Sequence, residues 1–495
     1  MRAIVVAALA CTSLLACSEA PAPREPALAF EDCGSRLDLT LLTGERADRL
    51  TFACATLDVP LRHHDPDGDT LPMAVVRVRD AQQHDRIGSL VLNPGGPGNP
   101  GLKWIVGWAA AFPDEVLERF DLVTFDPRGT GLSDGINCAD LPEDDEPSRH
   151  LDLTVDADYE YLVAYQRRRA ESCADSLTEE RISTFNTTAT ARDLDLLREA
   201  LGDGALTYLG FSYGAKLGGA YAHLYPDRVR ALALDAPADP RADPLEVAVQ
   251  QVQGFEDSFT AYAADCPNRP SCERLGDPQA ALASLVDRAD GMPIPSGRPV
   301  GDPPMGAVDV LFGVAGLLFS DDFWPLLDEA LAEALLGDSG TLHEAIDNTT
   351  GRNREDTGPD ASEALAVINC NDAPPGPTRD EVVAAAGRLA DRAPLFAPLG
   401  SWWLIGCAEW TAERTVLEAP EASSAPPLLV VGTRHDPATP YAGAVAFAET
   451  LGSGHLVTWE GQGHTAYGRS DCITDLVDTY LLELTVPAEG TRCPA

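Results

Sequence analysis

Gly210-Phe211-Ser212-Tyr213-Gly214 stands between an apolar run that ends at Leu209 and a stretch of helical character over 215–224. A serine between two glycines at such a junction predicts a sharp strand-to-helix turn, because the glycines remove the side chains that would clash there. A serine hydroxyl is a weak nucleophile, and this exposed position beside a base activates it. We therefore predict that Ser212 is a nucleophile, in preference to a residue of an ordinary structural turn.

Short apolar runs recur along the chain with helical stretches between them, a pattern typical of βαβ units on a parallel sheet. The predicted strands are 89–93, 122–126, 206–209, 231–235, 428–431 and 455–459. The strand rhythm stops between Pro237 and Pro427, where helical stretches such as 323–336 and 378–389 dominate. We expect a mostly parallel sheet flanked by helices, with an inserted, mainly helical cap domain.

An acid and a base are expected to follow such a serine along the chain, each in a loop after a later strand. Asp436 follows one predicted strand, and His464 follows the next. We predict that His464 takes the proton of Ser212 while Asp436 fixes the tautomer of the imidazole. His435 and His455 are the rival bases, but His435 is adjacent to the acid and His455 opens a strand.

A glycine-rich loop, Asn93-Pro94-Gly95-Gly96-Pro97-Gly98, follows the first predicted strand. Glycines allow the backbone to approach a developing oxyanion closely, and each such donor contributes about 3 kcal/mol in the transition state. We predict an oxyanion hole formed by the backbone N–H groups of Gly96 and Tyr213.

The N-terminus predicts export. Residues 1–16 read as a signal that is too short to span a membrane, and Leu14-Leu15-Ala16-Cys17 resembles a bacterial lipobox with Cys17 as the lipid-bearing residue. An ordinary cleaved signal with a chance cysteine is the alternative. We expect an exported protein that is lipid-anchored in the cell envelope, at the outer membrane or its periplasmic face if the host has one.

The predicted organisation along the chain has five parts. They are a lipoprotein signal peptide (1–16), a tether and N-terminal segment (17–50), the first part of the sheet domain (51–236), the helical cap (237–427) and the C-terminal part of the sheet domain (428–495).

Ten cysteines follow Cys17, and an even number in an exported chain predicts disulfides. We expect neighbours to pair in order among Cys33, Cys54, Cys138, Cys173, Cys266, Cys272, Cys370, Cys407, Cys472 and Cys493. No Cys-x-x-Cys cluster has histidines nearby, so we expect no metal and no other cofactor.

The formal net charge is −42, from 78 acidic and 36 basic side chains. Such a surface repels phosphate backbones, which excludes nucleic acid as a partner. After the signal, no segment offers the roughly 20 apolar residues of a membrane span, so membrane contact is expected only through the lipid anchor.

Taken in order, the motifs resemble those of the prolyl aminopeptidase family of α/β-hydrolases, with the closest likeness to secreted tripeptidyl aminopeptidases. They are the glycine-rich loop at 93–98, Asp126-Pro-Arg-Gly-Thr-Gly-Leu-Ser-Asp134, the pentapeptide 210–214, Asp436-Pro-Ala-Thr-Pro440 and Gly463-His464. Val367-Ile-Asn-Cys-Asn-Asp372 and the pair Cys472 and Cys493 match the tripeptidyl branch. Pro94 departs from the histidine of prolyl aminopeptidases, which weakens a strict proline preference.

The resemblance implies a serine exopeptidase whose partners are peptides with a free N-terminus. It also implies acidic residues under the cap that bind the substrate amine, and Asp372 is the position carried over, with Glu246, Glu256 and Asp257 as alternatives. An esterase or amidase on small acyl substrates is the competing function, because the fold does not choose between them. A binding protein without activity is disfavoured, since nucleophile, acid, base and oxyanion loop are all present.

Overall fold

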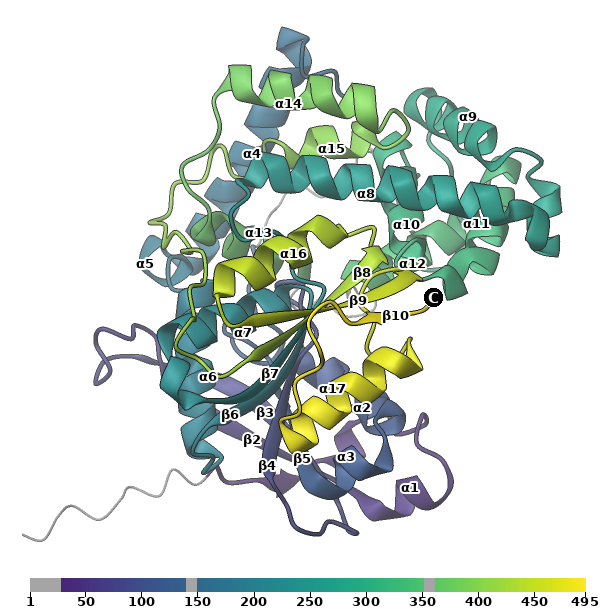
Figure 1. The fold of residues 1–495 in the computed structure, drawn as a ribbon. Coiled ribbons are helices and arrows are strands. Elements are labelled where there is room, and N and C mark those ends of the chain that lie inside the picture. Colours follow the sequence, from purple (N-terminus) through teal and green to yellow (C-terminus); the bar gives the residue numbers. More distant parts are fainter. Residues whose placement is uncertain (1–27, 139–148, 351–360) are drawn as a thin grey trace, which may run out of the picture.

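The computed structural model describes residues 28–138, 149–350 and 361–495 (Figure 1). The predicted signal and Cys17 lie outside the described residues. At the centre is a ten-stranded sheet with the order β1-β2-β3-β5-β4-β6-β7-β8-β9-β10. The strands are β1 (Glu31–Asp32), β2 (Leu50–Pro60), β3 (Thr70–Asp80), β4 (Gly88–Asn93), β5 (Phe120–Phe125), β6 (Leu206–Phe211), β7 (Val229–Asp235), β8 (Leu428–His435), β9 (Gly454–Gln462) and β10 (Arg492–Cys493).

The strands from β5 to β10 run parallel, as the alternation of strands and helices predicted. All six predicted strands belong to this part of the sheet. The chain crosses from β5, on one side of β4, to β6 on the other side, which makes the gap between β4 and β6 a topological switch point. In open α/β sheets, ligands bind beyond the carboxyl ends of the strands at such a point.

Helices cover both faces of the sheet. One face packs against α6 (Thr187–Ala200), α7 (Tyr213–Leu224) and α16 (Tyr441–Leu451), and the other against α2 (Ile105–Ala111), α3 (Asp114–Arg119) and α17 (Asp471–Glu483). Neighbouring residues of a strand alternate between the two cores, as Tyr208 and Leu209 do. Both faces are therefore buried, which explains why the central strands are continuous apolar runs.

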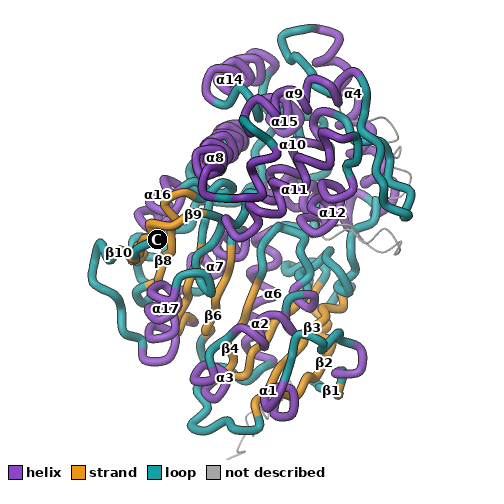
Figure 2. Tube along the Cα trace, turned by 90° about the vertical axis from the view of Figure 1, so that its right-hand side faces the viewer, coloured by secondary structure: helices purple, strands orange, loops and turns teal. Residues whose placement is uncertain are grey.

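The segment between β7 and β8 is helical and forms a third core above the sheet (Figure 2). Its helices of at least seven residues are α8 (Pro244–Asp265), α9 (Pro278–Gly291), α10 (Ala307–Leu317), α11 (Trp324–Leu336), α12 (Gly340–Thr350), α13 (Ala361–Asp372), α14 (Arg379–Arg392) and α15 (Ala397–Trp403). Leu162 of α4 (Asp156–Leu177) joins this core although it precedes β6, whereas Val367 of α13 packs against the sheet domain. One helix of the sheet segment thus packs in the core of the cap, and one helix of the cap segment packs in the core of the sheet domain.

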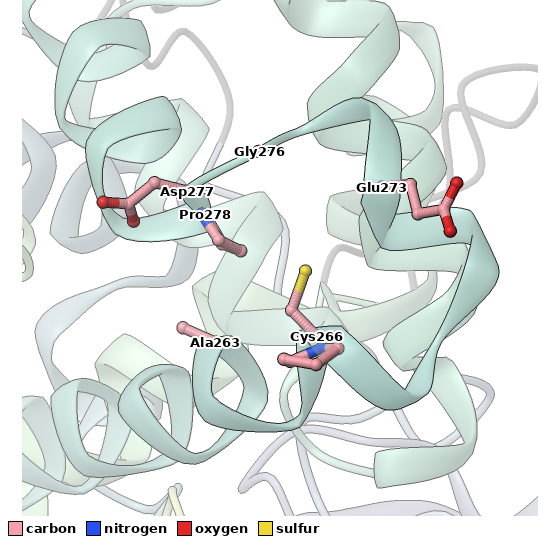
Figure 3. Close-up of a pocket in the computed structure, with 7 residues that line it drawn as sticks. Ala263, Cys266, Glu273, Gly276, Asp277 and Pro278 are labelled. Carbon is pink, nitrogen blue, oxygen red and sulfur yellow. The ribbon is translucent and has the colours of Figure 1, made fainter.

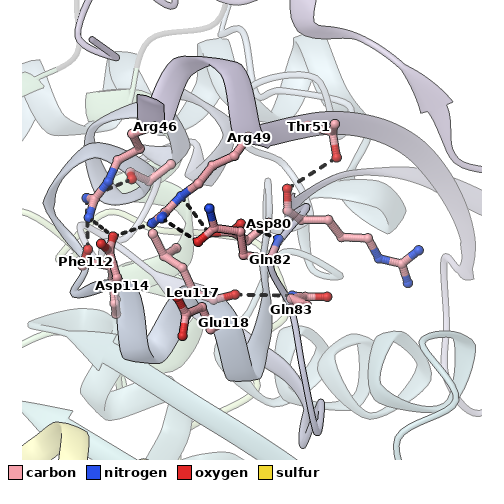
Figure 4. Close-up of polar contacts among 12 residues, drawn as sticks. Arg46, Arg49, Thr51, Asp80, Gln82, Gln83, Phe112, Asp114, Leu117 and Glu118 are labelled. Carbon is pink, nitrogen blue, oxygen red and sulfur yellow. Dashed lines mark hydrogen bonds and ion pairs between the residues drawn. The ribbon is translucent and has the colours of Figure 1, made fainter. Parts of the chain in front are cut away.

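A hairpin of β2 and β3 extends the sheet in the antiparallel sense and was not identified as strands from the sequence. Beside it, α1 (Gly44–Arg49) is anchored by two arginines (Figure 4). Arg49 Nε lies 3.0 Å from Asp80 Oδ2, and Arg46 donates to the carbonyl of Phe112 over 3.0 Å. Both arginines also pair with Asp114 of α3, so the N-terminal helix is fastened to the sheet domain.

Five disulfides confirm the predicted pairing of neighbouring cysteines. They are Cys33–Cys54, Cys138–Cys173, Cys266–Cys272, Cys370–Cys407 and Cys472–Cys493. Across the described ranges, no helix combines the length and the apolar character that crossing a bilayer requires.

Candidate active site

Ser212 occupies the turn between β6 and α7 with φ 56° and ψ −118°. Positive φ is rare for a residue with a side chain, and such strain persists only where surrounding contacts hold it. One of these contacts is the hydrogen bond that Ser212 N–H donates to the carbonyl of Asp235 over 2.8 Å. The structure thus places the predicted nucleophile in a strained strand-to-helix turn at the carboxyl end of the sheet.

Close backbone contacts explain the glycines around this serine. A Cβ on Gly210 would lie 2.4 Å from the carbonyl oxygen of Gly214. A Cβ on Gly214 would lie 2.6 Å from the carbonyl oxygen of Asn93. The turn is therefore packed against itself and against the glycine-rich loop, and a larger residue at either glycine would push them apart.

The glycine-rich loop reaches the turn because β4 pairs with β6, with Asn93 opposite Gly210. A Cβ on Gly95 would lie 3.2 Å from the backbone nitrogen of Tyr213. The N–H of Gly95 is occupied by Asn93 Oδ1 at 3.0 Å. Among the described residues, neither Gly96 N–H nor Tyr213 N–H has a hydrogen-bond partner, so both remain available as the proposed oxyanion donors.

Asp436 and His464 come together although 28 residues separate them. His464 Nδ1 lies 3.0 Å from each carboxylate oxygen of Asp436, which is buried. Asp436 Oδ1 also accepts the N–H groups of Ala438 and Thr439, at 2.9 and 2.8 Å. The Asp436 carboxylate is thus held in place within hydrogen-bond distance of the imidazole, and its role as the catalytic acid stays a prediction.

His464 is also held from the cap. The backbone N–H of His464 donates to the carbonyl of Phe319 over 2.8 Å. The centroids of the Phe319 and His464 rings lie 5.4 Å apart. Burial by itself lowers the pKa of His464, but the carboxylates of Asp436 and Asp235 outweigh this effect and the pKa is raised. The predicted base is therefore positioned jointly by the sheet domain and the cap.

No hydrogen bond joins the Ser212 hydroxyl to His464 within the described residues. Such catalytic hydrogen bonds are often long until substrate binds. Neither rival base contacts the Asp436 carboxylate in the described part of the chain: His435 is exposed, and His455 lies within β9. Of the three histidines considered, the structure brings only His464 to the predicted acid.

Asp372, the predicted anchor for a substrate amine, is buried at the end of α13 and has partners within the chain. Its carboxylate accepts the N–H of Thr187 at 2.9 Å and the Thr187 hydroxyl at 2.5 Å, and Lys216 Nζ lies 3.7 Å away. Burial raises the pKa of Asp372, although Lys216 and Thr187 act in the opposite direction. Lys216 competes with a substrate amine for this charge, so the predicted contact stays a prediction.

The three alternative anchors all lie on α8, which crosses over the ends of β8 and β9 (Figure 1). Glu246 lies 3.5 Å from Arg388, and Glu256 accepts the N–H groups of Leu395 and Phe396. Burial raises the pKa of Glu256 and of Asp257, and the neighbouring His435 opposes this rise at Asp257. Glu256 is thus held by backbone N–H groups, Asp257 is exposed, and among the described residues no ion pair with arginine or lysine is found for either.

Helix α8 contacts the loops that carry the acid and the base. A Cβ on Gly254 would lie 2.4 Å from the carbonyl oxygen of Pro437, next to Asp436. Ser258, one turn further along, accepts a hydrogen bond of 2.9 Å from the Gln462 side chain. The acidic residues of α8 are consequently carried by a helix that touches the site.

A cavity of about 370 Å³ lies elsewhere, at the far end of α8 (Figure 3). It is lined by Ala263, Cys266, Pro267, Glu273, Gly276, Asp277 and Pro278. None of the predicted site residues lines it apart from Cys266, which is bonded to Cys272. This cavity is separate from the serine, histidine and aspartate described above.

Some contacts of the site were not identified from the sequence. Asp235 holds both the Ser212 turn and the loop after His464, while Thr187 and Lys216 surround Asp372. Asp235 ends a predicted strand, so the rule that sites lie at the carboxyl ends of strands could have indicated it. Thr187 and Lys216 carried no such signal, because their neighbours are distant in sequence.

Comparisons with known proteins show which family the chain resembles. The sequence profile described as "alpha/beta hydrolase fold" matches residues 88–302, and the profile described as "TAP-like protein" matches residues 393–493. The chain is 36% identical to "Serine protease Hip1" of Mycobacterium tuberculosis over 89% of this chain and 87% of that protein. It is 35% identical to "Carboxylesterase B" of the same organism over 90% and 86% of the two chains. It is 29% identical to "Tripeptidyl aminopeptidase" of Streptomyces lividans over 89% and 83%.

We predict that Ser212→Ala abolishes turnover and leaves the fold intact, because alanine fits the turn but has no hydroxyl to attack a substrate. Steady-state rates and thermal unfolding of both proteins provide the check. A variant that keeps more than a small percentage of the wild-type rate would place the nucleophile elsewhere.

Asp436→Asn is expected to keep the geometry but favour the wrong imidazole tautomer, with a loss in kcat of about 10⁴-fold. A His464 pKa above its ordinary value of about 6.5 places the acid limb of kcat/KM above that pH, because His464 must be neutral to act as a base. Removing the Asp436 charge should move this limb to lower pH. pH–rate profiles of the two proteins test both effects, and an active Asp436→Asn variant would reject the assignment of the acid.

Proposed function

The chain belongs to the α/β-hydrolase family of serine peptidases, and we propose that it is an exported serine exopeptidase releasing short, tripeptide-like fragments from free N-termini. The observation that carries the proposal is the His464–Asp436 pair beside the strained Ser212 turn, at a site covered by an acidic helix. Its support from relatives is the similarity to a protein named tripeptidyl aminopeptidase over 89% of this chain.

In the proposed mechanism, His464 takes the proton of the Ser212 hydroxyl while the oxygen attacks the carbonyl carbon of the scissile peptide bond. The carbonyl oxygen becomes negatively charged and accepts hydrogen bonds from Gly96 N–H and Tyr213 N–H. The C–N bond then breaks, and His464 donates its proton to the leaving amine. Water, activated by His464, hydrolyses the ester on Ser212 and restores the free serine.

Recognition of a free N-terminus is assigned to carboxylates at the cap. An ammonium in a partly dry pocket requires a negative partner, since a buried charge without one is costly. Glu256 and Asp257 meet this requirement better than Asp372, whose charge is already matched by Lys216. Glu246 is the weakest of the α8 candidates because Arg388 lies beside it.

An esterase or amidase acting on small acyl groups is the second candidate. It is supported by the 35% identity with a protein named carboxylesterase B. The two functions require the same acyl-enzyme chemistry and differ in whether a free amine is recognised.

Export and lipid anchoring belong to the same proposal. Five disulfides are characteristic of an oxidising compartment outside the cytoplasm. The resemblance of Leu14-Leu15-Ala16-Cys17 to a lipobox supports attachment of lipid at Cys17. The proposed partners are peptides with a free N-terminus, and the net charge of −42 disfavours nucleic acid.

Acetylating the substrate amine is expected to reduce kcat/KM on the order of 10²–10³-fold, since losing one member of a buried pair costs about 3–5 kcal/mol. A tripeptidyl p-nitroanilide with a free or an acetylated amine, and a short p-nitrophenyl ester, make up the test. Equal rates on the two peptides would point to an endopeptidase or a general esterase.

The same three substrates identify the anchor. Glu256→Gln, Asp257→Asn and Asp372→Asn are compared with Glu329→Gln, an exposed carboxylate of α11, as the control. The variant of the true anchor should lose activity on the free-amine peptide and keep activity on the ester. If none of the three variants changes activity on the free-amine peptide, the anchor must be Glu246 or a group outside α8 and α13.

For lipid attachment, we predict that the exported protein begins at Cys17 and carries lipid on that residue. Mass spectrometry of the N-terminal peptide from the native host measures this. An unmodified terminus at any other residue would reject lipid anchoring without affecting the proposed peptidase activity.

A further inference from the structure

Asp235 lies at the centre of the site, although the mechanism above gives it no role. It ends β7, between β6 and β8, and is fully buried. Its backbone carbonyl accepts the N–H of Ser212 at 2.8 Å, and the following N–H of Ala236 donates to Val431 over 2.9 Å. The backbone of this residue therefore ties the nucleophile's turn to the neighbouring strand end.

The Asp235 side chain holds the loop that carries the base. Its Oδ2 accepts the N–H groups of Ala466 and Tyr467, both at 2.9 Å, just beyond His464 in the chain. Thr465, between them and the histidine, has φ 67°, a conformation that is uncommon for a residue with a side chain. The two hydrogen bonds help to hold this strained loop and fix the backbone from which the imidazole projects.

The uncharged oxygen of an amide side chain could accept these two backbone N–H groups. The residue at position 235 is nevertheless an aspartate. No arginine or lysine pairs with it among the described residues, and its Oδ1 has no hydrogen-bond partner there. Burying such a charge is costly unless another charge compensates it. Burial accordingly raises the pKa of Asp235 to about 6, and His464 and the two N–H donors oppose this rise.

The charges that face His464 come from several elements. Asp436 lies beyond β8, Asp235 ends β7, and Arg469 precedes α17. Arg469 is itself paired with Asp321 of the cap and donates to the carbonyl of Gln462, so its charge is partly balanced. Asp436 and Asp235 are thus the two carboxylates whose charges raise the pKa of His464.

We propose that Asp235 is a positioning residue for His464, which anchors the histidine loop through two hydrogen bonds and supplies a second negative charge beside the imidazole. Asp436 orients the imidazole ring directly. Asp235 acts through its charge and through its hydrogen bonds to the backbone of the loop after His464. The inference rests on His464 being the base, and it holds for peptide and ester substrates alike.

The test is Asp235→Asn in the full-length enzyme. The asparagine carbonyl can accept the same two N–H groups, and its amide can occupy the place of the partnerless Oδ1, so the substitution removes mainly the charge. The acid limb of kcat/KM should move to lower pH by on the order of one unit, with a fall in kcat of roughly tenfold. KM should change little.

Asp478→Asn is the matched control. Asp478 on α17 is also buried, burial raises its pKa to about 6 as well, and it accepts a hydrogen bond from the Tyr467 hydroxyl in the same loop. This control loses a carboxylate that contacts the loop without facing the imidazole, and its acid limb should stay at the wild-type pH. An unshifted limb in Asp235→Asn, or equal shifts in both variants, would overturn the proposal.

The pH–rate profiles are measured with both the tripeptidyl substrate and the ester. Failure of the exopeptidase proposal is thereby separated from failure of the proposed role of Asp235. An enzyme that cleaves only the ester still reports the acid limb. If Asp235→Asn does not fold, Asp235→Ser also removes the charge but shortens the acceptor, so its acid limb, rather than its kcat, is compared with that of Asp478→Asn. Complete loss of activity in Ser212→Ala remains the independent check that the reaction measured occurs at this site.

Discussion

The hydrogen bond from Ser212 N–H to the Asp235 carbonyl holds the strained turn on which the rest of the site depends. The Ser212 N–H, in a residue with φ 56°, reaches this carbonyl because β6 and β7 pair side by side with Phe211 opposite Asp235. The β4–β6 pairing then brings the glycine-rich loop against the same turn. One strand order therefore brings the Ser212 turn and the glycine-rich loop together, and the close contacts that result explain the glycines at 95, 210 and 214.

The cap contacts the loops that carry His464 and Asp436. Phe319, from the segment after α10, accepts the N–H of His464, and Gly254 of α8 packs on the loop that carries Asp436. Arg469 and Asp321 add an ion pair across the same contact. Because these contacts involve His464 and the loop of Asp436, a shift of the cap would also change the position of His464. The cap and the loops of His464 and Asp436 are thus physically connected.

Carboxylates near the site have different roles because their partners differ. Asp436 faces the imidazole, Asp372 is matched by Lys216, one of only two lysines in the chain, and Asp235 has no arginine or lysine partner among the described residues. Net charge or local acidity cannot separate these cases. Only burial and the nearest cation decide whether a carboxylate is available to a substrate amine, to the base or to neither.

The sequence by itself determined the parallel sheet, the helical insertion, the disulfide partners and the order of Ser212, Asp436 and His464, because these features leave local patterns of apolar runs, glycines and cysteines. The β2–β3 hairpin was not predicted because exposed and partly exposed residues alternate with the buried ones along its strands. Only the tertiary structure decided that Asp372 lies against Lys216 and that Asp235 accepts hydrogen bonds from the loop after His464. Those contacts join residues more than 100 positions apart, and the packing of strands and helices, which no local pattern records, sets their distances.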